Sequence, residues 1–366
     1  MSQIIFNGFY GFKNTGDDAF VEIASWGSKT YWDNKEITYF SGDDLPNTQI
    51  PIKEIYSPNT HKISQKISVF NASLKSDYFI NAGGSVFSEI RPLSNIAFAQ
   101  KARWLNPKLK HAAIGVSIGP FANIKNEKAV QNYLRSLKFL ALRDTYSYEY
   151  AKSLDLDYEP IKAFDLAALL PFCYENSIRT KKESKQKTIG ISICNYERYI
   201  NGDIKNEERR NQFVENVLTR LAKNKEYSFK FFIFNGNKHI GDERLTHSVA
   251  SLLPKEQYEI VPYSKTTLST WREIQACDFM FSTRLHASIF ACYAGVPFML
   301  IEYHRKCSNF LDDIGYDKNA RIYDGEKNPE EVAQDIARFV SGDYTFPSHV
   351  NETIERAKLN FTQVQL

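Results

Sequence analysis

The chain has 366 residues, which exceeds the size at which a single hydrophobic core keeps growing, so two domains are expected. Its 46 basic and 43 acidic residues nearly cancel, and this balance excludes a protein that grips nucleic acid mainly through phosphates. Any anion that it binds must be met by a few local cations, and we expect no nucleic-acid partner.

The five cysteines are widely spaced and form no CxxC pair, which argues against a disulfide framework and against a structural zinc site. The first residues contain neither a basic region nor a long apolar core, so no signal peptide is expected. The longest uncharged apolar stretch, residues 289–301, is too short for a membrane span and contains a glycine and a proline. We expect a cytoplasmic protein.

Short β-type runs alternate with helix-length segments along the chain, a pattern typical of βα units that build parallel sheets. In the first half, the predicted strands span residues 4–9, 78–82, 111–117 and 139–142. A basic run at residues 179–187 is interpreted as a linker, with contact to an anionic membrane surface as the alternative. In the second half, the predicted strands span residues 188–193, 229–234, 258–261, 279–281 and 298–301.

These elements predict two doubly wound, Rossmann-like α/β domains that face a central cleft. The predicted boundaries are residues 1–178 for the N-terminal domain, 179–187 for the linker and 188–345 for the C-terminal domain. An amphipathic helix at residues 346–366 would cross back to the first domain. In such folds ligands bind beyond the carboxyl ends of the strands, so function is expected in the loops that follow strands.

The segment FSTRLHAS, residues 281–288, lies where the strand at 279–281 gives way to a helix. With Ser282 or Thr283 as the N-cap, Arg284 and His286 fall in the first helical turn, where free backbone N–H groups favour an anion. An arginine adds bidentate recognition of a carboxylate or phosphate. The alternative is that Arg284 pairs with a nearby acid and His286 merely packs or caps.

The segment YHRK, residues 303–306, follows the next strand, so Lys306 could bring a second positive charge to the same cleft. The alternative is a solvated basic turn. His304 and Cys307 supply only two ligands and therefore do not predict a metal site.

The N-terminal loop at residues 7–19 carries glycines that do not fit the G-x-G-x-x-G dinucleotide pattern. Asp17 and Asp18 would repel a phosphate and suit a partner with hydroxyl groups. The alternative is that Asp17 caps a helix and the glycines only shape a turn. Gly83 and Gly84 allow either a close approach of the backbone to a ligand or a tight turn.

Arg143 and Asp144 repeat the strand-end arginine pattern in the first half of the chain. Asp144 is expected to cap the following helix, which would leave Arg143 free to reach the cleft. Asp165 is an acid within an apolar stretch, and we expect it to pair structurally with a strand-end arginine, ahead of a role in chemistry.

Taken together, these segments resemble the polysaccharide pyruvyl transferase family, whose members transfer the enolpyruvyl group of phosphoenolpyruvate onto a sugar as a ketal. The matching motifs are GFYGFKNTGDDA (8–19), GGS (83–85), GVSIGP (115–120), RDTYS (143–147), DLA (165–167), STRLH (282–286), GVP (295–297) and YHRK (303–306). They occur in the family's order. One departure is Asp18, which stands where an acidic residue, often glutamate, is usual.

The resemblance implies a glycosyltransferase-B-like fold and assigns expected roles to the matching residues. His286 would be catalytic, and the phosphoenolpyruvate contacts would be Arg143, Arg284 and Lys306. The acceptor contacts would be Asn14, Asp17, Asp18, Gly83 and Gly84. No metal and no cofactor are expected besides phosphoenolpyruvate as the donor substrate, and the acceptor would be a sugar or oligosaccharide, with a lipid-linked form left open.

The residues suit this reaction on physical grounds. Phosphoenolpyruvate carries a carboxylate and a phosphate, so its site needs two or more fixed cations. Ketal formation requires protonation of the methylene carbon, and histidine is the usual donor near neutral pH. Two alternatives stay open: a nucleotide-sugar-dependent glycosyltransferase of the same fold, and a non-catalytic glycan- or anion-binding protein.

Overall fold

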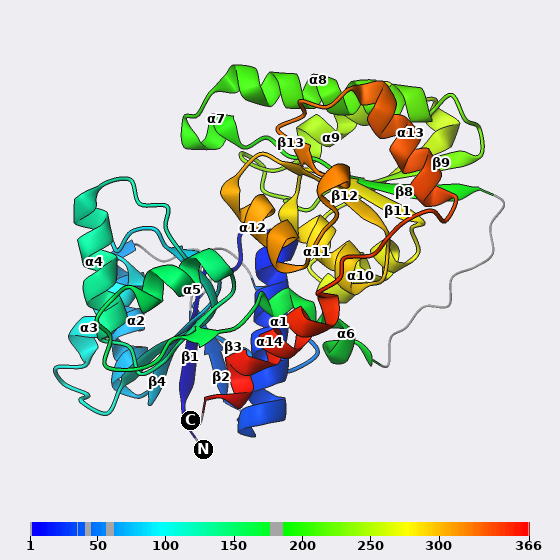
Figure 1. Cartoon of the computed structure of the whole chain (residues 1–366). Helices are drawn as coiled ribbons and strands as arrows, with labels where there is room; N and C mark the ends of the chain where they lie inside the picture. The colour runs from blue at the N-terminus through cyan, green and yellow to red at the C-terminus, as the bar shows by residue number, and fades with distance from the viewer. Residues whose placement is uncertain (1, 35, 41–44, 56–61, 176–185, 365) are drawn as a thin grey trace. The chain divides into compact units, whose positions relative to one another are not determined.

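The computed structural model describes residues 2–34, 36–40, 45–55, 62–175, 186–364 and 366. The chain forms two compact units, coloured by residue number in Figure 1. Unit 1 comprises Met1–Phe12, Asp17–Cys173 and Asn351–Leu366, and unit 2 comprises Lys13–Gly16 and Tyr174–Val350. Most of the expected linker, residues 179–185, lies outside the described residues.

Unit 1 is built on a parallel sheet of seven described strands in the order β3-β2-β1-β4-β5-β6-β7. The strands are β1 (Ile4–Asn7), β2 (Ile37–Tyr39), β3 (Lys53–Glu54), β4 (Tyr78–Phe87), β5 (Lys110–Ile118), β6 (Leu140–Leu142) and β7 (Ile161–Lys162). The helices are α1 (Thr15–Trp32), α2 (Lys62–Leu74), α3 (Asn95–Ala102), α4 (Ile124–Arg135), α5 (Thr145–Lys152), α6 (Leu170–Cys173) and α14 (Val350–Thr362). Helices α2 and α3 pack together (Figure 1). The ring of Phe361 on α14 stacks on that of Tyr31 on α1.

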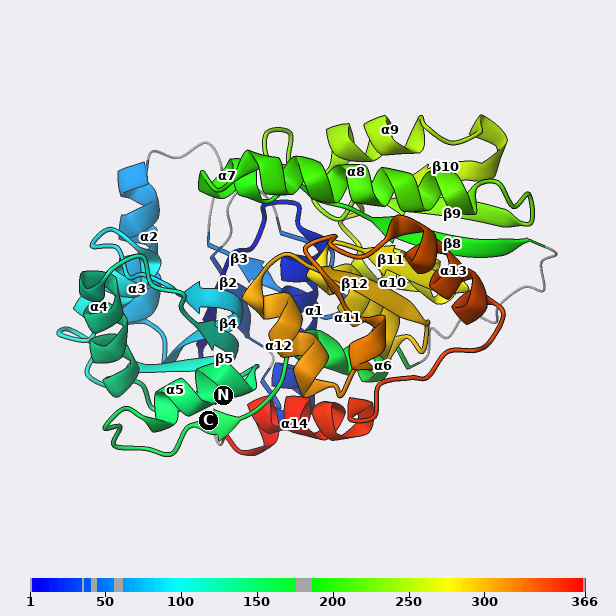
Figure 2. The same cartoon turned by 45° about the horizontal axis from the view of Figure 1, so that its top comes forward.

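Unit 2 contains a parallel sheet of six described strands in the order β10-β9-β8-β11-β12-β13. The strands are β8 (Lys187–Ser192), β9 (Tyr227–Phe232), β10 (Tyr258–Val261), β11 (Phe279–Ser282), β12 (Phe298–Glu302) and β13 (Ile322–Tyr323). The helices are α7 (Glu197–Ile200), α8 (Ile204–Leu221), α9 (Glu243–Ala250), α10 (Thr267–Gln275), α11 (Leu285–Tyr293), α12 (Arg305–Asp313) and α13 (Pro329–Val340). Helices α8 and α13 lie side by side (Figure 2).

Local sequence explains why these elements form where they do. The central strands β4, β5 and β11 are buried along almost their whole length, as expected for parallel strands covered on both faces. Helix α13 begins with Asn328 as a side-chain N-cap and a proline at its first turn, an arrangement that satisfies free N–H groups. The predicted class of two Rossmann-like α/β domains is therefore confirmed. Among the described residues, no helix is long and apolar enough to cross a membrane.

A continuous chain of polar side chains crosses the interior of unit 1. Its members, in order, are Lys66, Asn95, Asn7, Asn81, Tyr133 and His111. Each neighbouring pair is joined by a hydrogen bond, with distances of 2.9, 3.1, 2.8, 2.9 and 3.0 Å along the series. The Tyr133 hydroxyl accepts from Asn81, and either Nδ1 of His111 or the hydroxyl can be the donor in the last bond of the series. Burial lowers the pKa of His111 to about 3.

His111 is therefore expected to make folding stability depend on pH. In the unfolded chain a histidine binds its proton near pH 6.5, whereas in the folded protein His111 does so only near pH 3. Between these values the unfolded state binds more protons, so stability should fall as the pH decreases, by roughly 1.4 kcal/mol per pH unit. The free energy of unfolding, measured with urea at a series of pH values, should change less steeply with pH for His111→Gln than for the wild type. The exposed His247→Gln is the control, and equal slopes for all three proteins would contradict the assignment.

Candidate active site

The strand order of unit 2 reverses between β8 and β11, which makes their carboxyl ends the topological switch point of this sheet. Hydrogen bonds tie the two loops there. The backbone N–H of Cys194 donates to Oγ1 of Thr283 at 2.8 Å, and the N–H of Thr283 donates to the carbonyl of Ser192 at 2.9 Å. These hydrogen bonds fix the backbone at Thr283, and with it the start of the segment that contains Arg284 and His286.

Arg284 itself occupies the N-cap position of α11, so the expected cap at Ser282 or Thr283 is wrong. The reason is that both hydroxyls are used elsewhere. Ser282 bonds to the Arg284 carbonyl and to Ser288, whereas Thr283 accepts from the Cys194 backbone. Consequently His286 lies in the first turn of α11, as the sequence predicted.

The guanidinium of Arg284 forms a bidentate ion pair with Asp242, which precedes α9. Asp242 is fully buried and also accepts from the backbone N–H of Asn235 at 3.0 Å. Burial raises the pKa of Asp242, while the positive charge of Arg284 opposes that rise. The sequence alternative of an arginine paired with an acid is therefore correct. The pair orients Arg284, because a bidentate carboxylate fixes the plane of a guanidinium.

Residues 13–16 of the N-terminal loop are built into unit 2. The N–H of Thr15 donates to the carbonyl of Phe234 at 2.9 Å, the N–H of Gly236 donates to that of Lys13 at 2.8 Å, and Asn14 pairs with Asn235 in an antiparallel bridge. Asn14 was assigned to the N-terminal domain from the sequence, but it sits in the same unit as Arg284 and His286. It is joined to that arginine through Asn235 and Asp242.

Gly16 lies against the ring of His286. A Cβ atom added to Gly16 would lie 2.2 Å from Nδ1 and 2.4 Å from Cγ of this imidazole. Real Cβ atoms do not approach that closely, so the ring occupies space that only a glycine leaves open. The position of the His286 ring therefore explains why residue 16 is a glycine, and a nucleotide-binding role is not needed to explain it.

We expect Gly16→Ala to displace the His286 ring. If this ring has the catalytic role that the family resemblance implies, turnover should fall by up to about 100-fold, the effect of a 1 Å displacement of a reacting group. Alanine normally stabilises a helix by about 1 kcal/mol over glycine, so a lower melting temperature would reveal the collision. A double-mutant cycle with His286→Ala tests the collision, because this substitution removes the two nearest ring atoms and leaves the His286 Cβ at 2.9 Å. Additive effects of Gly16→Ala and His286→Ala on the melting temperature would contradict the proposed contact.

Lys306 lies at the start of α12, directly after β12. Its Nζ is 5.4 Å from the ring centroids of both Tyr196 and Tyr303, whose rings are 4.9 Å apart. Its backbone N–H donates to Nδ1 of His304, the N-cap of α12, at 3.1 Å. The side chain is therefore held over two aromatic faces, which attract a cation by their quadrupoles. No group of three or more His, Cys, Asp or Glu residues in the described chain could hold a metal ion.

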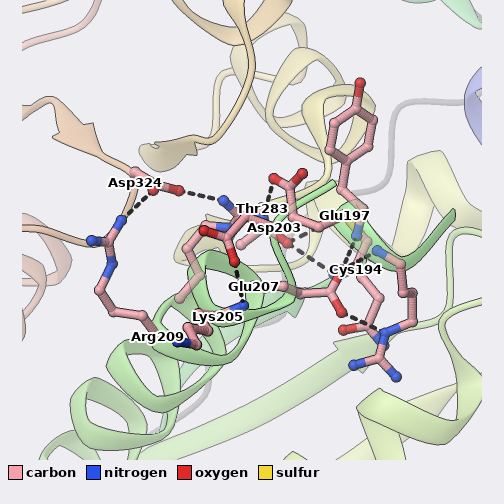
Figure 3. Close-up of polar contacts among 12 residues, drawn as sticks. Cys194, Glu197, Asp203, Lys205, Glu207, Arg209, Thr283 and Asp324 are labelled. Atoms are coloured by element: carbon pink, nitrogen blue, oxygen red, sulfur yellow. Dashed lines mark hydrogen bonds and ion pairs between the residues drawn. The ribbon is translucent and has the colours of Figure 1, made fainter. Parts of the chain in front are cut away.

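An ion network that is buried at Glu207 and Arg210 lies beside Tyr196 and Tyr303. Glu197, Glu207 and Asp324 of this network are labelled in Figure 3. Glu207, which is fully buried, accepts from the backbone N–H of Tyr196 at 2.6 Å and from the side chain of Arg198. Arg210 pairs with Asp324 and with Glu197, and its Cζ lies 5.4 Å from the Tyr303 ring centroid.

The sequence analysis missed this ion network. Its charges come from α7, α8 and the segment after β13, and nothing in the spacing of these residues indicates that they meet. Asn235 and Asp242 were missed for the same reason.

Of the site residues predicted in unit 1, Asp17 and Asp18 lie in the first turn of α1. The helix begins at Thr15, so the alternative of Asp17 as its N-cap is wrong. Strand β4 does not end at Ala82, as expected from the sequence, but runs on to Phe87. It passes through Gly83 and Gly84 with φ of 75° and 80°, and a register shift follows because this backbone leaves the regular β conformation.

Arg143 is 7% exposed, and the expectation that its side chain is free is wrong. It donates to Asp165 at 3.0 Å, to Ser117 at 2.6 Å and to Ser85 at 3.0 Å. These bonds use three of its five N–H donors. The expected pairing of Asp165 with a strand-end arginine is confirmed, as is the cap at Asp144, which accepts from the N–H of Ser147 at 2.8 Å.

The model of one protein family, described as polysaccharide pyruvyl transferase, matches residues 14–305. The chain belongs to the polysaccharide pyruvyl transferase family. The match begins at Asn14 and ends at Arg305, so it includes Arg143, Arg284 and His286 and stops one residue before Lys306. No curated protein sequence matches this family member.

Solved structures resemble this pyruvyl transferase family member in fold. The UDP-GlcNAc 2-epimerase of Methanocaldococcus jannaschii superimposes with a TM-score of 0.61 at 10% identity, over 98% of this chain and 97% of that one. Staphylococcus aureus MnaA, solved with UDP, gives 0.60 at 8% identity, over 99% and 92%. Anabaena HepE, solved with UDP and glucose, gives 0.54 at 10% identity, over 99% and 95%. At these identities the likeness shows the fold, which is of the glycosyltransferase-B type.

Proposed function

We propose that this family member transfers the enolpyruvyl group of phosphoenolpyruvate to two hydroxyls of a sugar in a polysaccharide or its precursor, forming a pyruvate ketal and releasing phosphate. The observation that carries the proposal is the placement of Arg284, His286 and Lys306. All three follow the carboxyl ends of β11 and β12, which are neighbours in one sheet. Two cations placed in this way match the carboxylate and the phosphate of phosphoenolpyruvate. The one titratable group matches the need to protonate its methylene carbon.

The donor would be held by Arg284 and Lys306, with the N–H groups that begin α11 and α12 adding partial positive charge. The bidentate pair with Asp242 holds the Arg284 fork in one plane, so its outer edge is preorganised for a carboxylate or phosphate. Arg143 remains a proposed anion contact of unit 1, through the two N–H donors that its partners leave.

His286 would act as the general acid. Protonated His286 gives its proton to the methylene carbon of phosphoenolpyruvate, and a sugar hydroxyl adds to the neighbouring carbon and loses its own proton. The second hydroxyl then displaces phosphate at that carbon. Of the two hydroxyl protons, one restores His286 and the other leaves with inorganic phosphate. Gly16 holds the imidazole in place for the first step.

Within unit 1, the acceptor hydroxyls are proposed to contact Asp17, Asp18 and the backbone of Gly83 and Gly84. The acceptor contact predicted for Asn14 belongs to unit 2 and stays a separate prediction. Carboxylates accept hydrogen bonds from sugar hydroxyls and repel phosphates, which suits an acceptor site more than a donor site. We propose that the protein acts in the cytoplasm, on an acceptor that can be lipid-linked at the inner face of the membrane.

The test is to incubate the protein with phosphoenolpyruvate and a panel of oligosaccharides and to follow phosphate release together with product mass. A product heavier by one pyruvate ketal supports the proposal. Because two of the similar structures were solved with UDP, a nucleotide-sugar-dependent reaction is the second candidate. UDP release from a UDP-sugar without phosphoenolpyruvate turnover would favour that reaction. Tight binding of phosphoenolpyruvate without turnover on any acceptor would indicate a non-catalytic binding protein.

A further inference from the structure

The loop between α3 and β5 presents two large apolar side chains to solvent at consecutive positions. Trp104 is 87% exposed and Leu105 is 71% exposed. No other large hydrophobic side chain in the described chain is as exposed as either. This loop connects α3 with β5, which are both labelled in Figure 2. The contact of such large apolar side chains with water is unfavourable, and exposed apolar patches are typical of surfaces that bind a partner.

This apolar tip, Trp104 with Leu105, is held by a rigid turn. The backbone N–H of Trp104 donates to Lys101 at 3.2 Å, and that of Leu105 donates to Ala102 at 3.0 Å. The side-chain amide of Asn106 donates to the carbonyls of Ser73 and Ser76, at 3.2 and 2.9 Å. The tip is therefore fixed in its exposed position by bonds to the neighbouring α2–β4 segment, so its exposure is a stable feature of the fold.

Exposed lysines lie near the apolar tip in the chain and at the neighbouring strands. Lys101 is in the last turn of α3, and the amino ends of β4, β5 and β6 carry Lys75, Lys108, Lys110 and Lys138. The ammonium groups of Lys101 and Lys110 lie over the rings of Phe98 and Tyr78, at 4.9 and 5.1 Å from the centroids. Acids also lie on this edge: Asp77 accepts from the backbone N–H of Gln3, and the exposed Asp155, Asp157 and Glu159 precede β7, where Glu159 pairs with Lys152. Lysines therefore predominate in the part of the edge formed by β4, β5 and β6, which includes the tryptophan.

We propose that this basic, tryptophan-tipped edge docks on an anionic lipid bilayer. Tryptophan prefers the level of the lipid headgroups, and lysines near such a surface gain electrostatic attraction to anionic lipids. A protein partner fits less well, because the cores of protein interfaces are depleted in lysine and bury far more apolar area than one dipeptide offers. The edge is opposite to the carboxyl ends of the same strands, so docking would leave Gly83, Gly84 and Arg143 unobstructed within unit 1.

The inference does not depend on the proposed reaction and is tested by vesicle binding. The full-length protein is sedimented with vesicles of phosphatidylcholine and phosphatidylglycerol, and in parallel with pure phosphatidylcholine. We expect binding to the mixed vesicles, weakened by salt, and a blue shift of tryptophan emission. Trp104→Ala with Leu105→Ala should weaken binding about tenfold or more and abolish the blue shift. Replacing Lys75, Lys108 and Lys138 by glutamine should weaken it by up to roughly fivefold for each lysine.

The matched control is Ile124→Ala with Lys125→Gln, which changes an exposed apolar residue and a lysine beyond the carboxyl end of β5. This control should bind the mixed vesicles as the wild type does. All variants should keep their melting temperatures, and the tip variant should act normally on a soluble acceptor. Equal binding to neutral and anionic vesicles, or unchanged binding by the tip variant, would overturn the proposal. Dimerisation that the tip variant abolishes, without vesicle binding, would show instead that this edge joins two copies of the chain.

Discussion

His286→Ala is expected to lower kcat for phosphate release from phosphoenolpyruvate by about 100- to 10,000-fold, the range that removal of a positioned general acid produces. The fold should survive, because His286 is only partly buried and lies at the first turn of α11, whose other side chains are buried in the core. Binding of phosphoenolpyruvate should change much less than kcat, since the two cations remain. The measurement combines a phosphate-release assay with a thermal melt and a titration of the donor.

Added imidazole separates proton donation from packing. If His286 is the acid, imidazole should restore part of the activity of His286→Gly, whereas a purely structural role would not respond. His247→Ala is the matched control, because His247 is an exposed histidine on α9 of the same unit and should be replaceable without effect. Full turnover by a folded His286→Ala protein would exclude the acid role.

The second large effect is expected at the buried pair of Arg284 and Asp242. Arg284→Ala leaves the fully buried Asp242 carboxylate without its charge partner, and breaking such a pair costs about 3–5 kcal/mol. It should also abolish tight binding of phosphoenolpyruvate, because the proposed donor contact is lost. Asp242→Asn should keep an acceptor for the Asn235 N–H but release the guanidinium, so we expect a smaller loss of stability and weaker donor binding.

Urea unfolding of both single variants and of the double variant measures the coupling between the two residues. The double variant should be clearly more stable than the sum of the single losses predicts, because it contains no unpaired buried charge. Arg209→Ala is the control for an exposed ion pair, that of Arg209 with Asp324, and should cost no more than about 1 kcal/mol. Additive losses at Arg284 and Asp242 would contradict the assignment of a coupled pair.

Much of the fold could be predicted because it depends on local patterns. The alternation of short apolar runs with helix-length segments reflects the two backbone periodicities, and it correctly indicated two parallel-sheet domains. The cap at Asp144 depends only on residues within three positions of it. The cost of burying an acid alone predicted that Asp165 pairs with a strand-end arginine, and the structure identifies this arginine as Arg143. Helix α11 begins at Leu285, but its N-cap is Arg284 and not Ser282 or Thr283, because the hydroxyls of these two residues bond to groups that the local pattern does not show.

The sequence by itself determined the two-domain α/β class, the family, and the positions of Arg284, His286 and Lys306 after strands. These follow from local periodicity and from short motifs in a fixed order. Only the tertiary structure decided what those side chains touch. It brought residues 13–16 into unit 2, set Gly16 against His286, and paired Arg284 with Asp242. Such contacts join residues far apart in the chain, and their energies depend on burial and exact distance, which no local pattern encodes.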